Sequence, residues 1–162
     1  MSLYRVLFVC MGNICRSPAG ECVFREFVQK SQSPDSVEVD SAGTIGYHTG
    51  NAPDHRMQAA GKRRGYEIRG SARQVEIEDF QRFDLIIAMD RDNFSDLSRL
   101  RSAAGEDAAE LRTFCSFSPE KDTLDIPDPY YGGGEGFERV LDLIESGCPQ
   151  ILQHALADGV GD

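Results

Sequence analysis

The chain has 162 residues, 40% of them hydrophobic and 27% charged, which is typical of a soluble globular protein and predicts a single domain over residues 1–162. The net charge of −10 argues against nucleic acid and against an anionic membrane surface as partners, and no apolar run is long enough to span a membrane. The five cysteines follow neither a disulfide framework nor a metal-ligand spacing, and the N-terminus lacks a signal-peptide pattern. We therefore expect a cytoplasmic protein without metal or cofactor, and we expect it to be a monomer.

The first part of the chain has the pattern of a strand, a tight loop and a helix. Four apolar residues at 6–9 predict a strand that is buried on both faces. Ser17 suits a helix N-cap and Pro18 the first helical position, so we expect a helix from Ser17 to about Ser31. Residues 37–40 alternate apolar and acidic side chains, which predicts a short strand at a sheet edge.

Helices and strands continue to alternate after a glycine-rich loop. Asp54 can cap a helix that runs to Gly65, and the basic residues 62–64 are better suited to complementing the dipole of that helix than to docking a partner. The later elements are expected to be a helical turn at 76–80, a strand at 83–89, a helix from Asp90 to Arg101, a strand at 111–114, a long connection at 116–136 and a helical region from 137 that Pro149 kinks or interrupts. The pattern predicts an α/β fold, a three-layer sandwich in which a four-stranded parallel sheet has helices on both faces.

Residues 10–17 carry the strongest chemical signal. Cys10 directly follows the first strand, and Arg16 follows it in a C-x5-R pattern that leads into a helix N-terminus. Amide groups at such a place bind anions, and they favour the thiolate form of a cysteine. Arg16 adds a planar fork of donors that suits phosphate. The loop therefore has the groups needed to take a phosphoryl group onto sulfur.

These motifs resemble those of the low-molecular-weight protein tyrosine phosphatases. The family signature matches Val-Cys-Met-Gly-Asn-Ile-Cys-Arg-Ser-Pro at residues 9–18. Further matching motifs follow in the family's order, at residues 40–44, 51–54, 72–74, 89–90 and 128–131. The resemblance covers nearly the whole chain and implies the family's fold, the hydrolysis of phosphotyrosine and phosphotyrosine-containing proteins as partners.

The resemblance also implies roles for individual residues. Cys10 is the nucleophile, Arg16 the phosphate clamp and Asp128 the general acid and base. A proton donor is needed because a phenol leaves with a pKa of about 10. The nearby carboxylates Asp122 and Asp125, and Glu120 with them, are expected to be solvated. The phosphate-binding loop comprises Met11, Gly12, Asn13, Ile14, Cys15 and Ser17.

Other residues are implied to support the loop or to line the substrate slot. Ser41 resembles a residue that supports Asn13, and Asp90 one that orients Arg16. An apolar and aromatic slot, deep enough to favour phosphotyrosine over phosphoserine, is expected from Ile14, Tyr47, His48 and Tyr130.

Two features qualify the resemblance. Cys15 resembles a thiol that pairs with the nucleophile on oxidation and protects it, although a simply buried thiol is the alternative. Relatives commonly have a histidine where this chain has Gly70, so the support behind the loop is expected to be incomplete or filled by water.

Three other functions remain open. A protein arginine phosphatase is the main alternative, and Ile14 opposes it because those relatives prefer a small hydroxyl residue there. An arsenate reductase needs further thiols, and residues 66–95 contain no cysteine. A non-catalytic phosphotyrosine-binding module would be expected to lack Cys10 or Asp128, and both are present.

Overall fold

A computed structural model describes residues 3–130 and 132–160 of the chain. Its centre is a parallel sheet of four strands in the order β2-β1-β3-β4. The bounds of the strands are Tyr4–Cys10 for β1, Val37–Gly43 for β2, Leu85–Ala88 for β3 and Glu110–Thr113 for β4. The predicted parallel sheet is confirmed, with β2 at one edge as expected.

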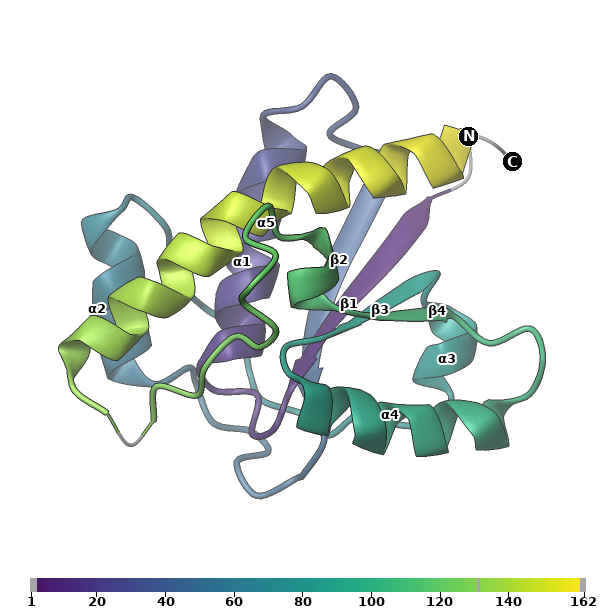
Figure 1. The fold of residues 1–162 in the computed structure, drawn as a ribbon, viewed down its shortest axis with the longest axis horizontal. Helices are drawn as coiled ribbons and strands as arrows, with labels where there is room; N and C mark the ends of the chain where they lie inside the picture. The colour runs from purple at the N-terminus through teal and green to yellow at the C-terminus, as the bar shows by residue number, and fades with distance from the viewer. Residues whose placement is uncertain (1–2, 131, 161–162) are drawn as a thin grey trace.

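Helices cover both faces of this sheet (Figure 1). On one face lie α1 and α5, with α2 packed against α5, and on the other lie α3 and α4. The bounds are Arg16–Gln29 for α1, His55–Arg63 for α2, Asp79–Arg82 for α3, Arg91–Ala104 for α4 and Gly134–Val160 for α5, with a 3-10 helix at Phe114–Phe117. This arrangement is the predicted three-layer sandwich.

The two central strands supply both layers of the core. Val6 and Phe8 of β1 join the apolar cluster beneath α1 and α5, whereas Leu7 and Val9 join the cluster beneath α4. Successive side chains of a strand point to opposite faces, so a central strand needs apolar residues at every position. The continuous apolar run of β1 is therefore explained by its place in the middle of the sheet.

Local signals located most helix starts, but two expectations are wrong. Asp54 and Asp90 cap α2 and α4 as predicted, by accepting from backbone N–H groups of those helices. Ser17 is not the N-cap of α1, which begins at Arg16 and has Cys15 at the cap position. Its hydroxyl faces the loop instead, where it has other hydrogen-bond partners. Of the kink or interruption expected at Pro149, the interruption is wrong, because α5 continues through this residue and buried packing there outweighs one lost backbone hydrogen bond.

Within residues 3–130 and 132–160, none of the helices combines the length and the apolar character that a membrane crossing requires.

Candidate active site

The loop at residues 11–15 lies at the carboxyl edge of the sheet, between the end of β1 and the start of α1. The chain after β2 supports it, because the N–H of Thr44 donates to the carbonyl of Cys10 at 2.9 Å. Gly43 allows this close approach. A Cβ at that position would lie 2.7 Å from the carbonyl oxygen of Met11 and 3.1 Å from the backbone nitrogen of Asn13. The loop therefore packs so closely against the backbone at Gly43 that any side chain at this position would collide with it.

The sulfur of Cys10 has two polar partners inside this loop. The N–H of Asn13 donates to Sγ at 3.3 Å, and the hydroxyl of Ser17 lies 3.0 Å from Sγ. Ser17 Oγ already accepts from the side-chain amide of Asn13 at 2.8 Å, and the carbonyl of Ala42 is 3.2 Å away. Its single hydrogen can point to either Ala42 or the sulfur. A thiolate would draw that hydrogen, so Ser17 can stabilise the charge by rotating one bond.

The side chain of Asn13 holds the loop in an unusual conformation. Asn13 has a φ of 59°, in the left-handed region that non-glycine residues rarely adopt. Its Nδ2 donates to Ser17 and to Ser41, at 2.8 and 3.0 Å, and its Oδ1 accepts from the N–H of Arg73 at 3.0 Å. Both amide hydrogens and the oxygen are thus used. Gly70 stands where relatives commonly have a histidine, and we expected the support behind the loop to be incomplete there. The hydrogen bonds of Asn13 are nevertheless complete without that histidine.

Arg16 is a buried cation held by acceptors from two segments of the chain. Its Nη1 donates to Asp90 Oδ2 at 2.6 Å and to the carbonyl of Ile126 at 3.0 Å, and its Nη2 lies 3.7 Å from Asp128 Oδ2. Burial alone would lower the pKa of Arg16, but the neighbouring Cys10, Asp90 and Asp128 outweigh it and raise the pKa. The guanidinium therefore stays charged and keeps a fixed orientation.

Asp128 reaches the pocket from a connection that is anchored just before it. The N–H of Ile126 donates to the carbonyl of Met89 at 2.9 Å, and Arg91 forms an ion pair with Asp125 at 3.0 Å. Asp125 is thus not the solvated carboxylate that was expected, and hydrogen bonds from Arg91 lower its pKa. Asp128 accepts from the N–H of Tyr130 at 3.0 Å and keeps its side chain 34% exposed. It is the acid of this connection that faces Cys10 and Arg16.

Cys10, Arg16 and Asp128 line one pocket of about 60 Å³. The remaining lining residues are Met11, Gly12, Ile14, Cys15, His48 and Tyr130. His48 and Tyr130 lie with ring centroids 6.3 Å apart and form the aromatic side of the entrance. The prediction that Tyr47 lines the pocket is wrong. Tyr47 is 84% exposed and packs edge-on against His48, with the two ring centroids 4.9 Å apart.

The sequence profile described as low molecular weight phosphotyrosine protein phosphatase matches residues 5–160, almost the full length. The chain belongs to this family. The human low molecular weight phosphotyrosine protein phosphatase is 43% identical over 150 residues, which are 93% of this chain and 94% of the human protein.

Solved structures of related phosphatases have the same fold. A protein tyrosine phosphatase from Entamoeba histolytica superposes with a TM-score of 0.88 at 39% identity, covering 96% of this chain and 98% of that one. An arginine phosphatase from Drosophila superposes with a TM-score of 0.85 at 32% identity, covering 92% of this chain and 96% of that one.

One functional neighbour of the phosphatase loop was missed from the sequence. Glu21 of α1 is buried, accepts from the hydroxyl of Ser41 at 2.6 Å and pairs with Arg25 one helical turn away. It therefore fixes the serine that holds Asn13. A signal existed, because Glu21 falls on the apolar face of the helix predicted here, and a carboxylate on such a face needs a buried partner.

Cys15 shares the pocket of this phosphatase with the nucleophile and is buried. Burial, with the nearby charges of Asp54, Cys10 and Asp128, raises the pKa of Cys15 to about 12. At neutral pH it is therefore a thiol, poorly suited to act as a nucleophile itself.

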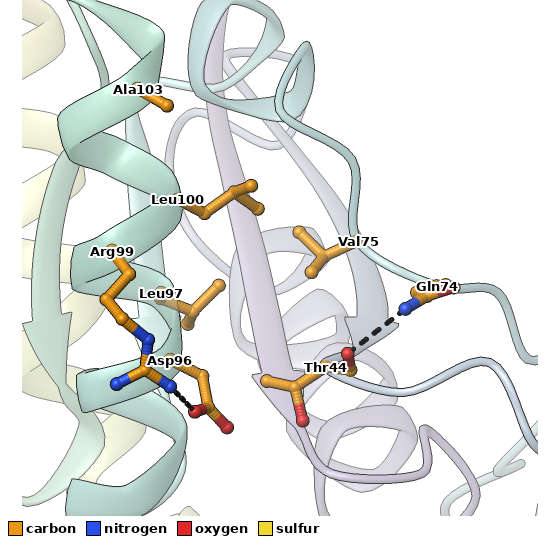
Figure 2. Close-up of a pocket in the computed structure, with 8 residues that line it drawn as sticks. All are labelled: Thr44, Gln74, Val75, Asp96, Leu97, Arg99, Leu100 and Ala103. Carbon is orange, nitrogen blue, oxygen red and sulfur yellow. Dashed lines mark hydrogen bonds and ion pairs between the residues drawn. The ribbon is translucent and has the colours of Figure 1, made fainter.

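A larger hollow of about 350 Å³ lies between α4 and two other segments, at Thr44 after β2 and at residues 74–75 before α3 (Figure 2). In it Val75 faces Leu97 and Leu100, and Asp96 pairs with Arg99 at the rim. These two charged side chains neutralise each other. The residues that line the larger hollow include no cysteine, unlike those of the pocket at Cys10.

Proposed function

We propose that this phosphatase hydrolyses phosphotyrosine in proteins through a phosphocysteine intermediate on Cys10. One observation supports this most directly: the sulfur, the Arg16 guanidinium and the Asp128 carboxyl face the same small pocket. Those are the nucleophile, the phosphate clamp and the proton donor that the reaction requires. Family membership supports the activity independently.

In the first step the Cys10 thiolate attacks phosphorus in line with the tyrosine oxygen. An S–P bond forms as the P–O bond to tyrosine breaks, while Arg16 and the loop amides hold the three equatorial oxygens. Asp128 gives its proton to the departing phenol oxygen. A bound phosphate dianion would compete with Asp128 for Arg16, whose Nη2 lies 3.7 Å from Asp128 Oδ2 in the free enzyme.

In the second step water attacks the phosphocysteine and breaks the S–P bond. Asp128, now a carboxylate, takes a proton from that water, and phosphate leaves. Ser17 can donate its hydrogen to the departing sulfur, because its hydroxyl is 3.0 Å from Sγ. The cation of Arg16 and the loop amides balance the charge, so no cofactor takes part in the proposed steps.

The walls of the pocket support phosphotyrosine as the substrate. Ile14 offers an apolar surface, and His48 and Tyr130 offer rings against which a phenyl group can pack. Arginine phosphatase activity is a second candidate, favoured by the likeness to the Drosophila enzyme. Ile14 argues against it, and the relative turnover of phosphotyrosine and phosphoarginine peptides separates the two.

The role of Asp128 is tested by replacing it with asparagine. On a phosphotyrosine peptide, D128N should lower kcat/KM by a factor of about 10² to 10⁴, the usual contribution of a general acid. This ratio reports the steps up to formation of the S–P bond, so it excludes the later attack of water, which Asp128 also assists. On an aryl phosphate with an acidic phenol, which leaves without a proton, the loss should be much smaller. D122N, at an exposed carboxylate of the same connection, serves as the control and should behave as wild type. Equal losses of D128N on both substrates would contradict the assignment.

We further propose that residues 1–162 act as one domain, as a cytoplasmic monomer that binds neither nucleic acid nor membrane. The net charge of −10 supports the last point, and five free cysteines suit a reducing compartment. Sedimentation of the purified chain tests the oligomeric state.

A further inference from the structure

The edge of the sheet opposite the phosphatase pocket carries a cluster of metal-ligand side chains. Glu110 is the first residue of β4, and His154 and Asp158 lie one turn apart on α5. One ligand atom from each lies within 4.8 Å of the others, and His154 Nε2 is 2.9 Å from Glu110 Oε1. We propose that Glu110, His154 and Asp158 bind one divalent transition-metal ion such as Zn²⁺.

A buried phenol next to this cluster supports the proposal independently. Tyr4 is only 5% exposed, and its hydroxyl interacts with Asp158, although the two groups form no hydrogen bond of ordinary distance and angle. The hydroxyl is thus placed to donate to this carboxylate. Carboxylate ligands of metal ions commonly accept such a hydrogen on their second oxygen, which orients the ligand.

The donor set fits the chemistry of zinc. One imidazole nitrogen and two carboxylate oxygens are typical zinc ligands, and a water molecule can complete a tetrahedron. Ligand atoms on tetrahedral zinc lie about 3.3 Å apart, so the cluster, at up to 4.8 Å, must close by about 1.5 Å. Glu110 and Asp158 are exposed and can move, whereas the ring of His154 is held edge-on against Phe117 at 5.4 Å.

The position of the cluster predicts what the metal does. Tyr4 and Cys10 are the first and last residues of β1, about 20 Å apart along the strand. A metal ion at the Tyr4 end would join the last turns of α5 to β4 without contacting the phosphate-binding loop. It should therefore stabilise the fold and take no part in phosphate hydrolysis. The sequence conceals the cluster, because Glu110 and His154 are 44 residues apart.

Calorimetric titration of the full chain with Zn²⁺ tests the site. The measurement is made in C10S, because a cysteine thiolate can itself bind zinc. We expect one ion per chain, an affinity at least tenfold weaker in H154A and in D158N, and a smaller loss in Y4F. H55A replaces an exposed histidine outside the cluster and should bind as the C10S parent does.

Thermal melting gives a second readout. Zinc should raise the melting temperature of C10S and leave that of C10S with H154A unchanged, each compared with the same protein without metal. Absence of zinc binding at micromolar concentrations, or unchanged affinity in H154A, would overturn the proposal. Neither result would bear on the phosphatase mechanism, which is measured on different residues.

Discussion

Asp90 has two separable tasks, and a pair of substitutions distinguishes them. Its Oδ2 accepts from Arg16 Nη1 at 2.6 Å, and its Oδ1 accepts from the N–H of Asn93 at 2.7 Å, which caps α4. Alanine removes both interactions. Serine keeps a short side-chain oxygen that can still cap the helix, but it cannot reach Arg16.

The two interactions contribute to different quantities. Loss of an N-cap costs about 1 kcal/mol of folding free energy, so D90A should be about that much less stable than D90S. A hydrogen bond to a charged group contributes about 1.5–3 kcal/mol. If this bond orients Arg16 for the phosphate in the transition state, both variants should lose kcat/KM by a factor of about 10 to 150.

Steady-state kinetics on a phosphotyrosine peptide and urea unfolding measure these effects separately. D90S should be about 1 kcal/mol more stable than D90A and should share its large loss of kcat/KM. Wild-type kcat/KM in D90S would refute the reasoning, because the carbonyl of Ile126, 3.0 Å from Arg16 Nη1, would then be enough to orient the guanidinium.

Two further predictions concern the phosphate-binding loop. G43A should lose about 1–3 kcal/mol of stability, with a fall in kcat, because the new Cβ would lie 2.7 Å from the carbonyl oxygen of Met11. G133A, where a Cβ meets nothing within 4 Å, should match wild type in melting temperature and rate, and equal behaviour of the two variants would contradict the close fit. One equivalent of peroxide oxidises Cys10, and the Cys15 thiolate can then attack the oxidised sulfur to form a Cys10–Cys15 disulfide. Because the pKa of Cys15 is about 12, its thiolate fraction rises tenfold with each pH unit, so the disulfide should form about ten times faster per unit between pH 7 and 9. Peptide mapping without reductant measures this rate, and a rate independent of pH would show that Cys15 is not the attacking thiol.

Features set by neighbouring residues were predictable from the sequence. The apolar run before Cys10 and the acids Asp54 and Asp90 before helical patterns indicated a strand and two caps correctly. The predicted residues Cys10, Arg16 and Asp128 come together in one pocket, because parallel strands and their loops meet at one edge of the sheet.

Features that depend on distant partners were not predictable in this way. Serine is a favoured N-cap residue, but the hydroxyl of Ser17 bonds to the sulfur of Cys10 and to the amide of Asn13 instead of capping α1. Asp125 looked like a solvated acid, and its partner Arg91 is 34 residues away. Sequence spacing contains no information on such pairings. The exposure of Tyr47 follows from the path of a loop, which local composition does not determine.

In the proposed mechanism the phosphoryl group passes through the sulfur of Cys10. The direct test mixes D128A with an aryl phosphate whose phenol is acidic, because this substrate forms the adduct without the acid while hydrolysis of the adduct is slowed. The mixture is quenched rapidly, and its peptides are analysed by mass spectrometry at a pH where S-phosphocysteine survives. One phosphoryl group per chain is expected on the peptide that contains Cys10, appearing and decaying at rates that match turnover, and none is expected in C10S. Turnover without that adduct, or an adduct on another residue, would contradict it.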